Sequence, residues 1–78
     1  MLEKSEQSRY IVTALRRGLA ILSLFRRERR VVTVPDIEAE LGLSRATAFR
    51  MAYTLERDGY LQRLPSSHAF QLGPKVLL

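Results

Sequence analysis

Two stretches decide the fold of this chain: Gly42-Leu43-Ser44-Arg45-Ala46-Thr47-Ala48-Phe49-Arg50 and, one helical turn later, Leu55-Glu56-Arg57-Asp58-Gly59-Tyr60. A glycine such as Gly42 ends a helix, because it adopts the left-handed conformation that closes the last turn. Ser44 is a preferred N-cap residue and begins the next helix. Gly59 ends that helix, and residues 60–64 are typical of a strand. The sequence therefore predicts two helices joined by a tight turn, with a strand directly after them.

The residues after this strand predict a hairpin. Residues 65–68 (Pro-Ser-Ser-His) have the composition of a turn, and residues 69–72 are typical of a returning strand. Gly73-Pro74 ends that strand, and residues 75–78 form an apolar run that resembles the opening of another element. Val31-Val32 is short and β-branched, which is typical of a minor strand.

The helix before the Gly42 turn has a clear beginning and end. Thr33 and Asp36 form a variant of the capping box, and Pro35 lies in the first turn, where its missing N–H does no harm. Ile37 and Leu41 are four residues apart and predict its buried face.

An earlier helix is expected over residues 10–25. Apolar residues recur there at helical spacing on a face that is wide enough to contact both its own domain and a partner; they are Ile11, Ala14, Leu15, Leu19, Ile21, Leu22, Leu24 and Phe25. Gly18 within this helix is typical of close helix packing. The basic run at residues 26–30 is expected to end the helix and to complement its dipole.

Together these elements predict a mainly α fold with a little β structure. We expect a winged helix-turn-helix: three helices and a short antiparallel β-hairpin, the wing. The domain is expected over residues 10–73, after a flexible tail at residues 1–9. Residues 74–78 are expected to begin another structural element outside this domain. Seventy-eight residues allow one small domain with one core.

Composition excludes several classes of protein. There is no cysteine, so neither a disulfide framework nor a thiolate metal site holds the fold. No apolar run approaches the ~18 residues that a membrane span needs, and no secretory signal is visible at the N-terminus. A cytoplasmic protein is expected. Lys and Arg number 13 against 8 Asp and Glu, a net charge of +5, and arginine predominates, which suits contacts to phosphate and guanine.

The helix over residues 44–58 carries the residue types that reading a DNA major groove requires. Ser44 and the free N–H groups behind it can hold a phosphate. Arg45 and Arg50 can form paired hydrogen bonds with guanine or clamp phosphates. Thr47 can bond a base edge or pack on a thymine methyl group, and Phe49 can pack on such a methyl group. The small residue Ala46 allows close approach. The opposite stripe predicts the buried face: Ala48, Met51, Ala52 and Leu55. The alternative for the face that carries Arg45, Arg50 and Tyr53 is an ordinary solvated helix face that binds nothing.

Other charged or polar positions leave alternatives open. The hairpin tip with Arg63 and Ser67 either lies on the DNA backbone or minor groove, or is an inert turn. The arginine run at residues 26–30 is either a nucleic-acid clamp or a solvated cluster, and its distance from the third helix favours the cluster. Acidic residues give the second helix a negative surface that cannot face phosphates: Asp36, Glu38 and Glu40.

No catalytic constellation, metal site or cofactor motif is visible. His68 is the only histidine and has no carboxylate pair nearby in the sequence. The leading hypothesis is a sequence-specific DNA-binding domain. The alternative is a winged helix used for protein–protein assembly, which would expose an apolar recognition face without cations; an enzyme is not expected.

Five segments, in order and spacing, resemble the N-terminal winged helix-turn-helix of IclR-type bacterial transcription regulators. The resemblance covers about residues 10–78, and its start looks most like the branch that controls aromatic-compound catabolism. The segments lie at residues 15–22, 33–37, 42–50, 55–61 and 70–77. The chain departs from the family pattern at Ala52, where a bulky apolar residue is common, and in the wing, which lacks the usual glycine and acidic residues.

The resemblance implies a partner, an assembly and a larger protein. Family members bind double-stranded DNA operators as dimers or pairs of dimers, paired partly through the first helix, and repress or activate nearby promoters. A linker helix starting near residue 74 leads to a C-terminal domain that binds a small-molecule effector, so we expect this chain to be part of a longer protein. Family contacts near the DNA backbone correspond to Arg17 and Thr33, and those of the recognition helix to Arg45, Thr47 and Arg50.

Overall fold

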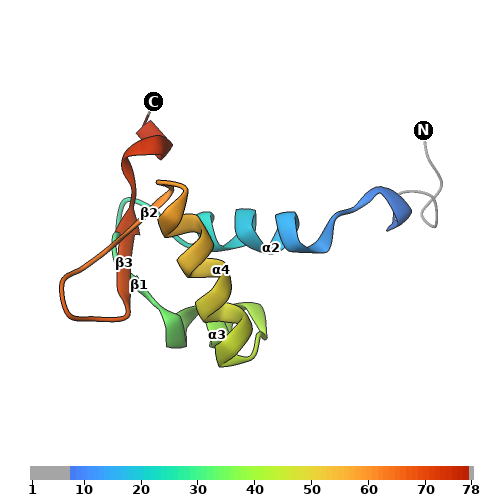
Figure 1. Ribbon diagram of the computed structural model, residues 1–78, viewed down its shortest axis with the longest axis horizontal. Helices are drawn as coiled ribbons and strands as arrows, with labels where there is room; N and C mark the ends of the chain where they lie inside the picture. Colours follow the sequence, from blue (N-terminus) through green and yellow to red (C-terminus); the bar gives the residue numbers. More distant parts are fainter. Residues whose placement is uncertain (1–7, 78) are drawn as a thin grey trace.

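The computed structural model describes residues 8–77 and has the predicted winged helix-turn-helix architecture (Figure 1). In Figure 1, α4 lies between a small sheet on one side and α2, which extends away from the sheet. Among the described residues, no helix is both long and apolar enough to cross a membrane. The elements in order are α2 (Thr13–Leu22), β1 (Val32–Thr33), α3 (Val34–Leu41), α4 (Arg45–Arg57), β2 (Leu61–Arg63), β3 (Ala69–Leu72) and the 3-10 helix η1 (Pro74–Leu77).

The sheet is antiparallel, with β3 in the middle. The predicted hairpin is confirmed: β2 pairs with β3, with Leu61 opposite Leu72 and Arg63 opposite Phe70. The minor strand predicted at residues 31–32 is β1, which begins one residue later and pairs Val32 with Phe70. Phe70 therefore has a strand on each side, and its side chain is completely buried.

The core joins both helical layers to the sheet. On α4, Ala48 and Ala52 are fully buried, while Met51 and Leu55 are partly buried against the core, as the stripe predicted. The buried hydrophobic residues are Ile21, Phe25, Val32, Val34, Ile37, Ala48, Ala52, Leu61 and Phe70.

Two glycines set the close turns around α4. Gly42 has φ 65°, the left-handed conformation that ends α3, and its N–H donates to the carbonyl of Glu38. Gly73 lies against the backbone of Gly59 so closely that a Cβ atom would collide with the Gly59 carbonyl, and its N–H donates to the carbonyl of Tyr60 over 2.9 Å. The first glycine directs the chain from α3 into α4, and the second holds the end of β3 against the end of α4.

The prediction for the first helix is wrong at both ends. Residues 11 and 12 are not helical, and α2 ends at Leu22, so the arginines do not form its last turn. The early C-terminal end of α2 has a physical reason in Phe25. Its side chain is 9% exposed and packs in the core, which it reaches because the chain has left the helix before it. Of the predicted flexible tail, residues 1–7 lie outside the described residues, and residues 8 and 9 are helical.

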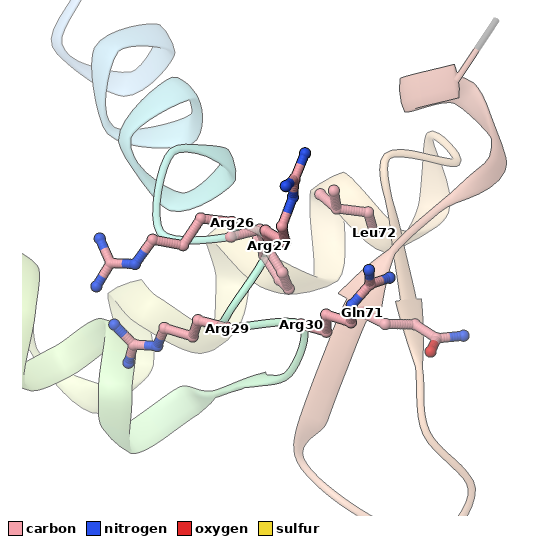
Figure 2. Close-up of a pocket in the computed structure, with 7 residues that line it drawn as sticks. Arg26, Arg27, Arg29, Arg30, Gln71 and Leu72 are labelled. Carbon is pink, nitrogen blue, oxygen red and sulfur yellow. The ribbon is translucent and has the colours of Figure 1, made fainter.

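The basic run instead forms a tight turn after α2 (Figure 2). The N–H of Arg26 donates to the carbonyl of Arg29 over 3.0 Å, and the N–H of Arg29 donates back over 2.9 Å. Figure 2 shows the side chains of Arg26 and Arg29 extending in one direction and that of Arg27 in another. The turn thus directs the side chains of Arg26 and Arg29 to one side and that of Arg27 to another.

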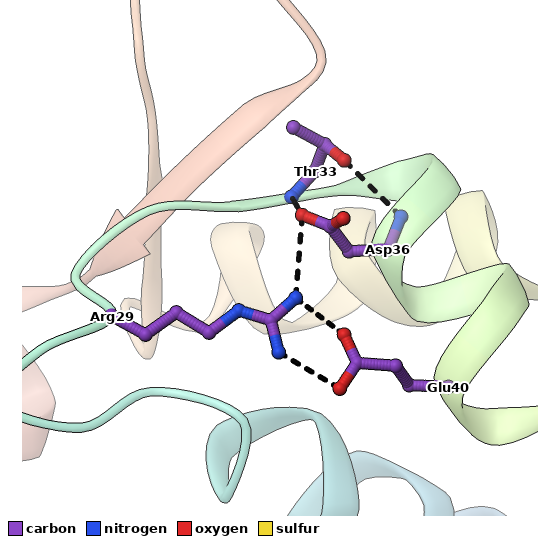
Figure 3. A network of polar contacts seen from close by, with 4 residues as sticks. All are labelled: Arg29, Thr33, Asp36 and Glu40. Carbon is purple, nitrogen blue, oxygen red and sulfur yellow. Dashed lines mark hydrogen bonds and ion pairs between the residues drawn. The ribbon is translucent and has the colours of Figure 1, made fainter.

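Arg29 ties this turn to α3, through Asp36 in its first turn and Glu40 in its last (Figure 3). Its guanidinium forms two hydrogen bonds with the carboxylate of Glu40, one of them 2.8 Å long, and lies 3.6 Å from Asp36. The predicted capping box is confirmed: the N–H of Thr33 donates to Asp36 over 2.8 Å, and the N–H of Asp36 donates to the Thr33 hydroxyl over 3.1 Å. The hydrogen bond from the Thr33 N–H, then the side-chain hydrogen bond with Thr33 and the charge of Arg29, lower the pKa of Asp36, and the hydrogen bond from Arg29 lowers the pKa of Glu40.

The depressed pKa of Asp36 predicts a pH-dependent contribution to stability. A carboxylate with a lowered pKa in the folded state stabilises the fold above its ordinary value of 3.8, and this stabilisation is lost as the pH falls through the folded value. We expect Asp36→Asn to lower the free energy of unfolding by about 0.5–1 kcal/mol at pH 7, because the capping box keeps its shape but loses the charge of a half-buried carboxylate that solvent still partly screens.

Thermal unfolding of the Asp36→Asn variant and the parent at pH 7 and pH 3 tests this expectation. The difference in Tm should narrow at pH 3. Glu28→Gln, whose carboxylate forms only an exposed ion pair with Arg26, is the control and should leave Tm nearly unchanged at both pH values. An equal difference in Tm at both pH values would show that the Asp36 charge does not stabilise the fold.

Candidate nucleic-acid interface

The N-terminus of α4 is capped as predicted. The Ser44 hydroxyl accepts a hydrogen bond from the N–H of Thr47 over 3.2 Å and donates to the Thr47 hydroxyl over 3.0 Å. Arg45, Ala46 and Arg50 are exposed on the same helix, whereas Thr47 is half-buried. A helix N-terminus carries a partial positive charge, so this end of α4 presents that charge together with two guanidinium groups.

Arg45 has a carboxylate neighbour that the sequence did not reveal. Its Nε lies 3.4 Å from Oε2 of Glu38 on α3, and its side chain is 81% exposed. The negative surface predicted for α3 is therefore paired: Glu38 with Arg45, and Asp36 and Glu40 with Arg29. These partners lie on different elements, so helical spacing alone could not find them. An exposed pair of this kind contributes little to stability, so Arg45 can exchange it for a stronger anion.

Phe49 is not on the fully exposed face that the sequence predicted. It is half-buried and packs against the core, because β2 and the turn after it fold back onto α4. Its ring centroid lies 6.2 Å from that of Tyr53 and 6.1 Å from that of His68 in the turn at residues 65–68. The side chain thus connects α4 to the wing.

The candidate residues of the wing have partners within the protein. The guanidinium of Arg63 lies over the rings of Phe49 and Phe70, and its Nη2 donates to Glu56 over 3.1 Å. The Ser67 hydroxyl donates to the carbonyl of Leu64 over 3.0 Å and accepts from the N–H of Ala69 over 3.2 Å, which closes the turn.

The two candidates outside α4 and the wing differ in their surroundings. Thr33 uses both its hydroxyl and its N–H in the capping box of α3. Arg17 is exposed on α2, the helix that extends from α4 away from the sheet (Figure 1). The structure therefore gathers the α4 and wing candidates on neighbouring elements and places Arg17 on a separate one.

A shallow, mainly apolar hollow lies where α3, α4 and the wing meet. It is lined by Val34, Pro35, Arg45, Ala46, Phe49 and His68. Three of these residues were predicted as DNA contacts on α4, and His68 comes from the wing turn. A surface with a guanidinium at its rim and an apolar floor can accept the deoxyribose and phosphate groups of a DNA strand.

The arginine turn lies at the other end of the sheet. Arg26, Arg27, Arg29 and Arg30 surround a second shallow hollow with Phe25, Gln71 and Leu72 (Figure 2). The register pairs Leu72 with Leu61, far along β3 from the turn at residues 65–68. Arg26 lies 3.6 Å from Glu28, and Arg29 is held by α3. Of the two interpretations of this run, the solvated cluster fits the position better than the clamp.

Within residues 8–77, no group of three or more His, Cys, Asp or Glu side chains is arranged to hold a metal ion. The surface around α4 presents the guanidinium groups of Arg45 and Arg50 and the capped helix N-terminus.

Known proteins resemble this chain over most of its length. Residues 14–65 match the family model described as the IclR helix-turn-helix domain. The chain is 31% identical over 67 residues to the HTH-type transcriptional regulator XynR of Escherichia coli (strain K12). The matched region covers 86% of this chain and 27% of that protein. The chain is 36% identical over 66 residues to the Pca operon regulatory protein of Acinetobacter baylyi (strain ATCC 33305 / BD413 / ADP1), covering 85% of this chain and 23% of that protein.

A solved structure gives the same assignment. The crystal structure of an IclR family transcriptional regulator from Brucella abortus superposes with a TM-score of 0.85 and 36% sequence identity, covering 97% of this chain and 30% of that one. This chain thus spans about a quarter of the length of the curated relatives that it matches. It belongs to the IclR family of helix-turn-helix transcriptional regulators.

Proposed function

We propose that this domain binds double-stranded DNA for a bacterial transcription regulator, with α4 in the major groove and the wing along the backbone or in the minor groove. The observation that carries the proposal is the capped N-terminus of α4, which exposes Arg45, Ala46 and Arg50 and shares a hollow with His68 of the wing turn. The net charge of +5 agrees with a polyanionic partner. The matched relatives are regulators and not enzymes by name.

Each residue of the proposed interface has a chemical role. The N–H groups behind Ser44 hold a phosphate. Arg45 and Arg50 donate paired hydrogen bonds to guanine or clamp phosphates. Ala46 lets the backbone approach the bases, Thr47 contacts a base edge, and Phe49 meets a thymine methyl group or a sugar at the apolar hollow. Nearer the backbone we place Arg17, Thr33 and Ser67.

We also propose that two copies pair through α2. This helix leaves large apolar side chains in solvent, among them Leu15, 61% exposed, and Leu19, 56% exposed. A Cβ atom at Gly18 would meet nothing within 4 Å, so a second helix could approach there. The apolar groove is lined by Ala14, Leu15, Gly18, Leu19, Leu22, Met51, Thr54, Leu55 and Tyr60. A dimer would place two α4 helices on a pseudo-palindromic site.

In this proposal the complete regulator is cytoplasmic, represses or activates its promoter, and responds to a small molecule through a further domain. The alternative, a winged helix for protein–protein assembly, is less well supported. The α4 surface exposes guanidinium groups beside its apolar hollow, and the matched proteins are named as regulators.

Replacing the exposed arginines of α4 tests the groove assignment. We expect Arg45→Ala and Arg50→Ala each to weaken binding by about 1–3 kcal/mol on a duplex selected from a random pool, since each removes a base or phosphate contact. Fluorescence anisotropy across a salt series measures the affinities. Arg27→Ala, in the turn after α2, is the matched control and should bind nearly as well as the parent. Unchanged affinity in both α4 variants would refute the groove assignment.

Charging the α2 groove tests the pairing. Leu19→Glu places a carboxylate where a second copy would pack, so we expect loss of cooperative binding to a duplex with two half-sites while a single half-site is still bound. Electrophoretic mobility shift assays distinguish the two complexes. Val31→Glu, at a position 45% exposed and outside the groove, is the control. Cooperativity that persists in Leu19→Glu would show that the copies pair through another surface.

A further inference from the structure

Arg63 is held by more contacts than any other arginine of the proposed interface. Its guanidinium carbon lies 5.7 Å from the ring centroid of Phe49 on α4 and 5.4 Å from that of Phe70 on β3. Its Nη2 donates to Glu56 on α4 over 3.1 Å. Cation–π contacts and a charged hydrogen bond therefore act on the same planar group.

The spacing of these residues explains how the cluster joins two elements. Phe49 and Glu56 are seven residues apart on α4, and residues at this spacing share one face of a helix. Arg63 follows Glu56 by seven residues on β2, which lies beside that face after the turn at Gly59. Arg63 thus bridges α4 and the wing, and the edge contact between Phe49 and His68 joins the wing turn to the same ring.

The environment of Arg63 does not suit a group that binds phosphate. The side chains of Arg63 and Glu56 are only 30% and 29% exposed, and the Nε of Arg63 is buried without a hydrogen-bond partner. Moving the guanidinium to a phosphate would break both ring contacts and leave the half-buried carboxylate of Glu56 unpaired, which is costly. Arg45, 81% exposed, has none of these constraints.

We propose that Arg63 is a positioning residue that fixes the wing relative to α4, and that it is not itself a phosphate ligand. The proposal rests on the proposed DNA-binding function. In this proposal Arg63, Glu56, Phe49 and Phe70 set the distance between α4, which enters one DNA groove, and the turn at residues 65–68, which touches the DNA backbone or the neighbouring groove. The sequence prediction that Arg63 contacts DNA is the competing interpretation.

The two roles predict different salt dependence. Each phosphate ligand releases counterions when it binds. Its removal therefore makes the negative slope of log affinity against log salt less steep, by about 0.9. We expect Arg63→Met to bind a selected duplex about fivefold to tenfold more weakly with the slope unchanged, because wing contacts become less well placed. Arg63→Lys should be similarly weakened, since an ammonium cannot stack as a guanidinium does. Arg45→Met should also weaken binding, and it should reduce the magnitude of the slope if Arg45 clamps a phosphate. Arg27→Met should change neither the affinity nor the slope.

Glu56→Gln supplies an independent arm. If Glu56 holds Arg63 in place, Glu56→Gln weakens binding, and its effect is not additive with that of Arg63→Met. If Arg63 contacts phosphate, removing the acidic neighbour strengthens binding. In the DNA-free protein, NMR should show the Arg63 Nε–H shifted upfield by the rings and protected from exchange. This last readout does not depend on any variant folding.

The outcomes separate the two claims. A slope reduced by about 0.9 in Arg63→Met, normal affinity in Arg63→Lys, tighter binding in Glu56→Gln, or an Arg63 signal like that of a free arginine would each overturn the positioning role alone. Absence of salt-dependent DNA binding by the parent chain would overturn the proposed function and, with it, the role of Arg63 on DNA.

Discussion

The structure depends on the turn between α3 and α4. Gly42 takes the left-handed conformation that ends α3, and the N–H groups of Gly42 and Leu43 both donate to the carbonyl of Glu38, the second over 3.2 Å. Only Gly42 and Leu43 therefore separate the end of α3 from Ser44, which caps α4. Because the turn is so short, the direction of α4 is set by α3, and the burial of Ala48 and Ala52 follows from that direction. Any other residue at position 42 would have to adopt a strained backbone conformation, and the exposed arginines of α4 would lose their common orientation.

Four arginines of this small domain divide into two groups by their partners. Arg29 and Arg63 are bound to carboxylates on helices, and each joins a non-helical segment to the helix that it faces. Arg50 is exposed on α4, and Arg45 has only a 3.4 Å contact with Glu38. The first group stabilises the arrangement of the elements, and the second group is available to a phosphate or a base. A count of basic residues does not show this division, because it depends on which elements meet.

Much of the fold could be predicted because it is encoded locally. The caps at Thr33 and Ser44, the stop at Gly42 and the hairpin at residues 61–72 each depend on residues within a few positions of one another, and the structure confirms them. The end of α2 was missed because Phe25 leaves the helix to join a core built from distant segments. The exposure of Phe49 was wrong for the same reason: only the folded wing covers it. Pairing of β1 with β3 brings together residues more than thirty positions apart, which no local pattern reports.

The central claim is that the capped end of α4 and the wing turn form one DNA-binding surface. The most direct measurement is a two-dimensional NMR titration of this chain with duplex DNA, following each backbone amide. The account predicts that the largest shifts fall on residues 44–50 and 65–68, with smaller shifts at Arg17 and Thr33. Shifts concentrated in the α2 groove, or confined to the arginine turn at residues 26–30, would contradict it.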